Sequence, residues 1–154
     1  MRVLVDTSVW SLALRRSEQA EGNEAAELRR LIAGHVVEIV GPIRQEVLSG
    51  VRDASHFERL ASHLQAFPDA AIRTEDYVTA AKFFNLCRSK GIQGSNTDFL
   101  ICAVAVRHDF AVFTIDRDFR LFAKHVPVVL HELKTGGEQR GAPRPHARQR
   151  AHGG

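Results

Sequence analysis

Four acidic side chains stand where one predicted element gives way to the next. Asp6 and Asp116 follow predicted strands, Asp98 begins a strongly apolar helix, and Glu46 borders the apolar face of another helix. In a parallel sheet the ends of strands and the starts of the following helices gather on one edge. We therefore expect these four carboxylates, which are far apart in the sequence, to converge.

The chemistry that suits such a cluster is hydrolysis assisted by a metal ion. Several carboxylates that lie close together cannot all ionise without a cation between them. A site made only of oxygen ligands, with no Cys or His, suits Mg²⁺ or Mn²⁺ better than zinc. Such an ion lowers the pKa of a bound water, holds a phosphate oxygen and stabilises the leaving oxygen. The acid set therefore predicts hydrolysis of a phosphodiester.

Each acid also has a plainer interpretation when it is taken alone. Asp6 and Asp98 could be helix caps or first-turn acids, which the helix dipole favours. Glu46 could be a surface acid, and Asp116 could be a turn residue. Asp118 is expected to cap the short helix that follows it rather than to bind metal. The metal-site interpretation therefore depends on the four acids occurring together.

The elements that must position these acids alternate between strand and helix. Short apolar segments predict strands at 3–5, 36–40, 111–114 and 126–130, with a further strand near 70–73. Helical spacing of apolar residues predicts helices at 8–16, 24–33, 42–49, 55–63, 74–89, 98–106 and 119–122. Asn23 and Thr74 are expected to cap their helices, and the polar loop 92–97 is expected to end in a cap. No hairpin signal joins two strands, so we predict an α/β three-layer sandwich with a central parallel sheet flanked by helices.

Length and charge predict one folded domain with a basic extension. The formal net charge of +3 comes from residues 135–154, which are rich in Gly, Pro and Arg, while residues 1–134 are balanced. We predict a folded domain over 1–134 and a disordered basic C-terminal tail over 135–154. The tail could be a solvated segment without a function, or it could attract nucleic acid weakly and in a salt-dependent way.

Nothing in the sequence predicts export or membrane insertion. The longest unbroken apolar run, Phe99–Val106, is far below the roughly 20 residues that a membrane span needs. The N-terminal apolar run stops at Asp6, so it is not a signal peptide. Cys87 and Cys102 lack metal-ligand spacing and are interpreted as reduced core thiols of a cytoplasmic protein.

These segments together resemble a PIN domain, and specifically the VapC-type toxins of bacterial toxin–antitoxin operons. Four segments carry the resemblance in the family's order over residues 1 to about 133: Val5–Trp10, Gln45–Gly50, Asn96–Ala103 and Thr114–Phe119. The resemblance implies a PIN fold and Mg²⁺- or Mn²⁺-dependent endoribonuclease activity on RNA. It also implies a homodimer that a cognate antitoxin inhibits.

The resemblance further implies roles for individual residues. Asp6 and Asp98 would be the firmest metal ligands, Asp116 would complete the site, and Glu46 would hold a metal or orient water. Supporting hydrogen bonds would come from four neighbours: Thr7, Ser8, Thr114 and Asp118. The early helices, with Trp10 and the region 42–63, would form the groove for an antitoxin helix. Core packing is the alternative role for Trp10.

Two other functions remain open at this point. A phosphatase or phospho-acceptor domain also places an Asp after its first strand, but a haloacid dehalogenase-type phosphatase wants a second Asp where this chain has Ser8. A non-catalytic module that binds RNA or a protein partner is the other alternative. The complete acid set argues against it, because unneeded buried carboxylates reduce stability.

Overall fold

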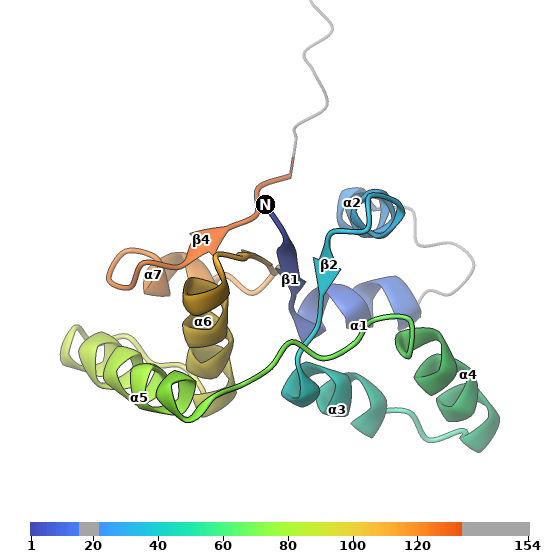
Figure 1. Ribbon diagram of the computed structural model, residues 1–154, viewed down its shortest axis with the longest axis horizontal. Helices are drawn as coiled ribbons and strands as arrows, with labels where there is room; N and C mark the ends of the chain where they lie inside the picture. The colour runs from blue at the N-terminus through green and yellow to red at the C-terminus, as the bar shows by residue number, and fades with distance from the viewer. Residues whose placement is uncertain (16–21, 134–154) are drawn as a thin grey trace, which may run out of the picture.

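A computed structural model describes residues 1–15 and 22–133 of the chain (Figure 1). The predicted basic tail, 135–154, lies outside the described residues, so its predicted disorder is not tested. No helix in the described ranges is long and apolar enough to cross a membrane.

Four parallel strands form the centre of the molecule, in the order β2-β1-β3-β4. They are β1 (Val3–Val5), β2 (Val37–Glu38), β3 (Ala111–Phe113) and β4 (Val129–Leu130). The predicted parallel sheet is therefore confirmed, although β2 and β4 are shorter than expected. The predicted strand at 70–73 is wrong: an isolated bridge joins Ile39 to the preceding residue, Asp69, and after Ala70 N donates to the carbonyl of Ile39 at 2.8 Å the chain leaves the sheet.

Seven helices in the described ranges surround the sheet. In sequence order they are α1 (Thr7–Arg15), α2 (Asn23–Ala33), α3 (Gly41–Ser49), α4 (Ala54–Leu64), α5 (Thr74–Ser89), α6 (Asn96–His108) and α7 (Asp118–Phe122). Figure 1 shows them in two groups, with α5, α6 and α7 on one side of β1 and β2 and with α1 to α4 on the other. The predicted α/β sandwich is confirmed.

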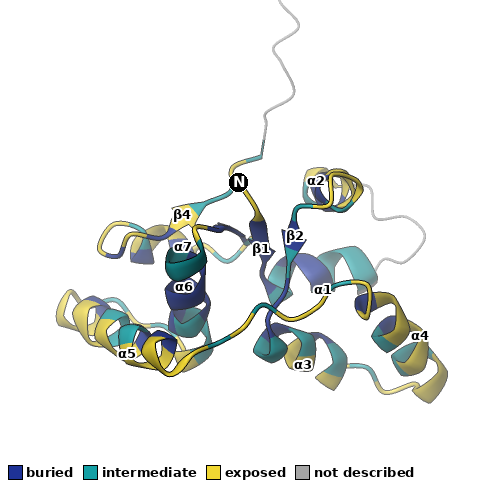
Figure 2. Ribbon diagram, in the orientation of Figure 1, coloured by how far each residue is buried: buried dark blue, intermediate teal, exposed yellow. Residues whose placement is uncertain are grey.

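The core is formed by the first strand and the apolar helix that precedes β3. All three residues of β1 are at most 2% exposed, and five consecutive residues of α6, 101–105, are buried (Figure 2). A helix that is apolar nearly all round must be covered on most sides. The residues that directly follow β1 and directly precede α6 are therefore attached to the most rigid part of the molecule.

The helix starts differ from the predicted caps by one or two residues. Asn23 and Thr74 are the first helical residues, preceded by Gly22 and Arg73 at the cap positions. Helix α6 is capped by Ser95, because the Ser95 hydroxyl accepts from Asp98 N at 3.1 Å. In return, Asp98 Oδ2 accepts from Ser95 N at 3.1 Å. This reciprocal pair fixes the start of α6 in a capping box.

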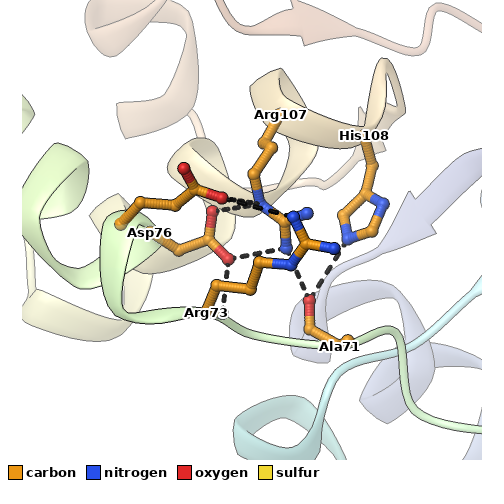
Figure 3. A network of polar contacts seen from close by, with 6 residues as sticks. Ala71, Arg73, Asp76, Arg107 and His108 are labelled. Carbon is orange, nitrogen blue, oxygen red and sulfur yellow. Dashed lines mark hydrogen bonds and ion pairs between the residues drawn. The ribbon is translucent and has the colours of Figure 1, made fainter.

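A partly buried ion pair joins the start of α5 to the end of α6 (Figure 3). Arg107 Nε and Nη2 donate to the two carboxylate oxygens of Asp76, at 2.6 and 2.8 Å. Arg107 Nη2 also donates to the carbonyl of Ala71 at 2.8 Å. The Arg107 guanidinium holds the pKa of Asp76 below its usual range, although burial opposes this shift. The pair therefore fixes the direction of α6, whose first turn carries Asp98.

Candidate active site

Asp6 lies between β1 and α1 and is held there by both its backbone and its side chain. Its backbone N donates to the carbonyl of Phe113 at 2.9 Å, and its own carbonyl accepts from Val9 N at 3.1 Å. The side chain is buried, and Oδ2 accepts from Ser8 Oγ at 2.8 Å and from Thr114 Oγ1 at 2.9 Å. One carboxylate oxygen of Asp6 is therefore fixed by hydroxyls from two segments of the chain.

Asp116 is joined to Asp6 through Thr114. Asp116 N donates to Thr114 Oγ1 at 3.0 Å, and the same hydroxyl donates to Asp6. Asp116 Oδ1 accepts from Asp118 N at 2.9 Å. The expectation that Asp118 caps α7 is therefore wrong, because Asp118 is the first helical residue and the carboxylate that receives its N–H is that of Asp116.

Asp98 lies in the first turn of α6 and is half-buried. Burial raises the pKa of this carboxyl, and the negative charges of Asp6 and Asp116 raise it further, while the hydrogen bonds with Ser95 oppose the rise. Like charges have this effect only when they are close. Asp6, Asp98 and Asp116 therefore share one electrostatic environment, although they come from three separate segments of the chain.

Glu46 approaches the same region from α3. Its Oε2 accepts from Thr7 Oγ1 at 2.7 Å, and Thr7 directly follows Asp6. The Glu46 residue is exposed. It therefore lies at the solvent side of the acidic group and is connected to it by the start of α1.

The acids fit a divalent ion that keeps much of its water. In the described part of the chain, no three His, Cys, Asp or Glu side chains are close enough to enclose a metal ion. However, Asp6 Oδ1, Asp98 Oδ1 and Asp116 Oδ2 accept no hydrogen bond from the described residues. A buried polar atom without a hydrogen bond occurs only at Trp10 Nε1 among the described side chains. The three carboxylate oxygens therefore are not fully buried and reach solvent. Mg²⁺ typically binds one or two carboxylates and keeps several waters. This donor set can supply the carboxylates.

Thiol ligands do not contribute to this donor set. Cys102 and Cys87 are buried and unpaired with each other. Burial is the main cause that raises the pKa of both thiols, and the charge of Asp98 adds to the rise at Cys102. Only a thiolate is a good metal ligand, so the oxygen-only character predicted for the site is retained.

Sequence reasoning missed Ser95, which fixes the Asp98 side chain. The spacing Ser95-Asn96-Thr97-Asp98 is that of a capping box and could have identified it. It also missed Gly94, where a Cβ would lie 2.5 Å from Phe122 and 2.9 Å from Phe99. No local pattern marks Gly94, because its requirement arises from rings that pack against it from α6 and α7.

Comparison with known proteins decides the family. The sequence model of the PIN-domain family matches residues 3–125, which include all four acids. The chain belongs to the PIN-domain family. The predicted family resemblance is therefore confirmed.

Relatives of similar length share a substantial part of the sequence. VapC ribonuclease Mb1587 of Mycobacterium bovis is 32% identical over 127 residues, which cover 79% of this chain and 92% of the relative. Ribonuclease VapC11 of Mycobacterium tuberculosis shows the same identity and the same coverage. Both relatives are ribonucleases by name, and the match covers nearly their full length.

Solved structures confirm the fold at lower sequence identity. FitAcB from Neisseria gonorrhoeae superposes with a TM-score of 0.68 at 20% identity, covering 84% of this chain and 96% of that chain. VapBC2 from Rickettsia felis, bound to a DNA fragment from its promoter, gives 0.67 at 14% identity, covering 85% and 98%. At these identities the likeness establishes the fold of this PIN domain.

Proposed function

We propose that this PIN domain is a metal-dependent endoribonuclease that acts as the toxin of a toxin–antitoxin pair. The observation that carries the proposal is the set Asp6, Asp98 and Asp116, with one oxygen of each held by hydrogen bonds and the other open to solvent. The names of the relatives, which are VapC ribonucleases, give the substrate class.

The chain's own residues would bind and orient the reacting groups. Asp6, Asp98 and Asp116 would hold Mg²⁺ or Mn²⁺, and Glu46 would hold a metal or orient the attacking water. When bound, the ion would activate a water and stabilise charge on the phosphate and on the leaving oxygen. In the hydrolysis, the water oxygen bonds to phosphorus, the bond from phosphorus to the leaving oxygen breaks, and that oxygen takes up a proton. Ser8 and Thr114 would keep the Asp6 carboxylate in one orientation.

Cleavage of an unstructured RNA by the purified protein tests this proposal. We expect cutting with Mg²⁺ or Mn²⁺ and none with EDTA, because the carboxylates alone cannot activate water. Asp6→Asn should abolish cutting, because one negative ligand is lost while the shape of the side chain is kept. The circular dichroism spectrum and Tm should stay close to those of the wild type.

Two outcomes would contradict the nuclease proposal. Full activity of Asp6→Asn would remove the acidic site from the reaction. RNA binding that is equally strong in EDTA, without any cutting, would favour the non-catalytic RNA-binding alternative. Glu58→Gln, which changes an exposed acid on α4, is the matched control and should cut like the wild type.

An antitoxin segment has a candidate groove between α1, α3 and α4. This hollow of about 330 Å³ is lined by apolar residues such as Leu14, Val47 and Leu60, and it also contains Glu46. Solved structures with this fold include VapBC2 from Rickettsia felis and VapBC-1 from nontypeable Haemophilus influenzae, and the family resemblance implies an antitoxin partner. We therefore expect a partner segment with an apolar face and a cation that reaches Glu46. Trp10 is only 3% exposed and packs against Phe67, so it belongs to the core rather than to this groove.

The assembly and location follow from the same proposal. Action on cellular RNA would place the protein in the cytoplasm, which agrees with two buried free cysteines. A homodimer is expected from the family resemblance. Light scattering of the purified protein, alone and with its antitoxin, measures both assemblies.

A further inference from the structure

A second hollow opens beside the acidic site, at the carboxyl ends of β3 and β4. It has a volume of about 420 Å³ and shares Thr114 and Asp116 with the site described above. We call it the β3–β4 hollow. Its volume is within the range of about 300–1,000 Å³ that is typical of ligand pockets. A molecule seated in it would lie against Asp116 and one hydrogen bond away from Asp6, because Thr114 Oγ1 donates to Asp6 Oδ2.

Two arginines line this hollow without an anionic partner. Arg117 and Arg120 are exposed, and neither forms an ion pair or a side-chain hydrogen bond with residues 1–14 or 22–133. By contrast, Arg107, Arg44 and Arg30 are all paired with carboxylates. Glu24 and Glu132 also line the hollow, but neither pairs with these arginines.

His131, another residue that lines the hollow, is held by several contacts. His131 Nε2 lies 2.8 Å from Glu27 Oε1, and the His131 ring packs edge-on against Phe113. Its backbone N donates to the carbonyl of Val112 at 2.8 Å. The lining of the hollow thus combines a residue bonded to the sheet edge with two exposed guanidinium groups that have no anionic partner in the described ranges.

A phosphate is the ligand that this arrangement suits best. Guanidinium groups present paired N–H donors that match phosphate oxygens. An RNA strand that brings one phosphate to the acidic site must also bring its neighbouring phosphate close to those same carboxylates, where like charges repel. Two cations that line the same hollow as Asp116 would offset this repulsion.

We propose that Arg117 and Arg120 are positioning residues that hold the phosphate next to the bond that is cut, with its nucleotide seated in the β3–β4 hollow. This inference rests on the proposed nuclease function. It adds a subsite for the RNA strand that is separate from the groove between α1, α3 and α4. The two arginines act on substrate binding and not on the bond-breaking step.

Steady-state cleavage of a labelled, unstructured RNA tests the subsite in the full-length protein. We compare the wild type, the double variant R117Q/R120Q, and the control R59Q/K82Q. The control removes two exposed cations of α4 and α5 that form no ion pair within the described ranges and do not line the hollow. We expect R117Q/R120Q to raise KM about tenfold and to change kcat by less than about threefold. R59Q/K82Q should change each constant by less than about twofold.

A second substrate localises the effect to one phosphate. Once the cut position is mapped, the linkage beside it is made an uncharged methylphosphonate on a 2′-O-methyl nucleotide. The wild type should bind this RNA more weakly than the all-phosphate RNA of the same sequence. R117Q/R120Q should no longer distinguish the two, because the cations that sense the charge are gone.

The outcomes separate this inference from the nuclease proposal. If the wild type cuts RNA but R117Q/R120Q has the KM of R59Q/K82Q, or loses kcat at unchanged KM, the subsite is wrong and the nuclease stands. If the wild type does not cut, the nuclease proposal fails, and RNA affinity measured by fluorescence anisotropy decides the subsite. In that case, log K for RNA binding is plotted against log salt concentration. The slope for R117Q/R120Q should be less steep than the wild-type slope by roughly 0.7 for each lost phosphate contact. An unchanged slope overturns the subsite.

Discussion

At the scale of single residues, the central feature is the pair of hydroxyls on Asp6. Ser8 and Thr114 donate to the same oxygen, Oδ2, so the other oxygen has a defined direction. The sequence predicted Asp6, Ser8 and Thr114 as neighbours through family resemblance. Their types alone did not indicate which oxygen is bound, because that depends on how β1 and β3 pair.

Removing one of these hydroxyls should weaken catalysis without unfolding the protein. We expect Thr114→Val to lower kcat roughly 10–100-fold, as is typical when a partner of a metal ligand is lost. Thr114→Ser keeps the hydroxyl and should restore most of the rate. Cleavage kinetics and thermal melts measure the two effects. Equal rates for the Val and Ser variants would mean that the Thr114 hydroxyl does not orient Asp6.

Glu27 makes stability depend on acid pH. Its hydrogen bond with Arg30, helped by His131, lowers its pKa from 4.5 to about 2, although burial opposes this shift. Because the pKa is lower in the folded than in the unfolded protein, ionised Glu27 stabilises the fold fully above about pH 4.5. This stabilisation is lost as the pH falls toward 2. We expect Glu27→Gln to lower Tm by several degrees at pH 7 and by much less near pH 3. Glu58→Gln is the exposed control, and a pH-independent difference for Glu27→Gln would contradict the linkage.

At the scale of elements, the direction of α6 decides where Asp98 points. The capping box with Ser95 fixes its first turn, and the ion pair of Arg107 with Asp76 fixes its last turn against α5. Helical periodicity predicted α5 and α6 well. It could not predict the ion pair, because Asp76 resembles an ordinary first-turn acid until α6 is packed beside it.

Breaking the ion pair should destabilise the contact between α5 and α6. Asp76→Ala removes both short hydrogen bonds from Arg107 and the acceptor of Arg73 N at the start of α5, so we expect Tm to fall by about 5 °C. Glu75→Ala is the comparison, because Glu75 is 60% exposed and its contact with Arg107 Nε is longer, at 3.8 Å. Such an exposed ion pair adds little stability, so Tm should change by less than about 1 °C. If Asp76→Ala and Glu75→Ala have the same Tm, the ion pair between Asp76 and Arg107 does not stabilise the packing of α5 on α6.

At the scale of the whole molecule, the strand and helix pattern predicted the layers but not the strand order. Alternating strands and helices without hairpins favour parallel pairing, and the structure agrees. The extra strand predicted at 70–73 is wrong because Ala70 and Ile72 pack against the core from a connecting segment, and an apolar pattern of this length does not distinguish such a segment from a strand. The starts of α2, α5 and α6 differ from the predicted caps by one or two residues. A cap rule that considers one residue type at a time does not determine these positions.

The described domain should not depend on the C-terminal basic segment for stability. We propose that a chain ending at residue 134 folds like the full chain, because the described sheet and the apolar residues that form or cover its core lie within residues 3–133. Its Tm should stay within about 1 °C of the full-length value. RNA affinity at low salt should fall slightly, since the removed segment carries the net positive charge. A large loss of Tm would place part of the core beyond residue 134.

The strand order also has a consequence for how the chain folds. Strand β1 pairs with β3 through Val3 and Ala111, so its second partner comes from the distal third of the polypeptide. Closing so long a loop is entropically unfavourable until other contacts form, and folds dominated by distant pairings acquire their native state slowly. We therefore expect the acidic site, which spans the junction of β1 and β3, to assemble late during refolding.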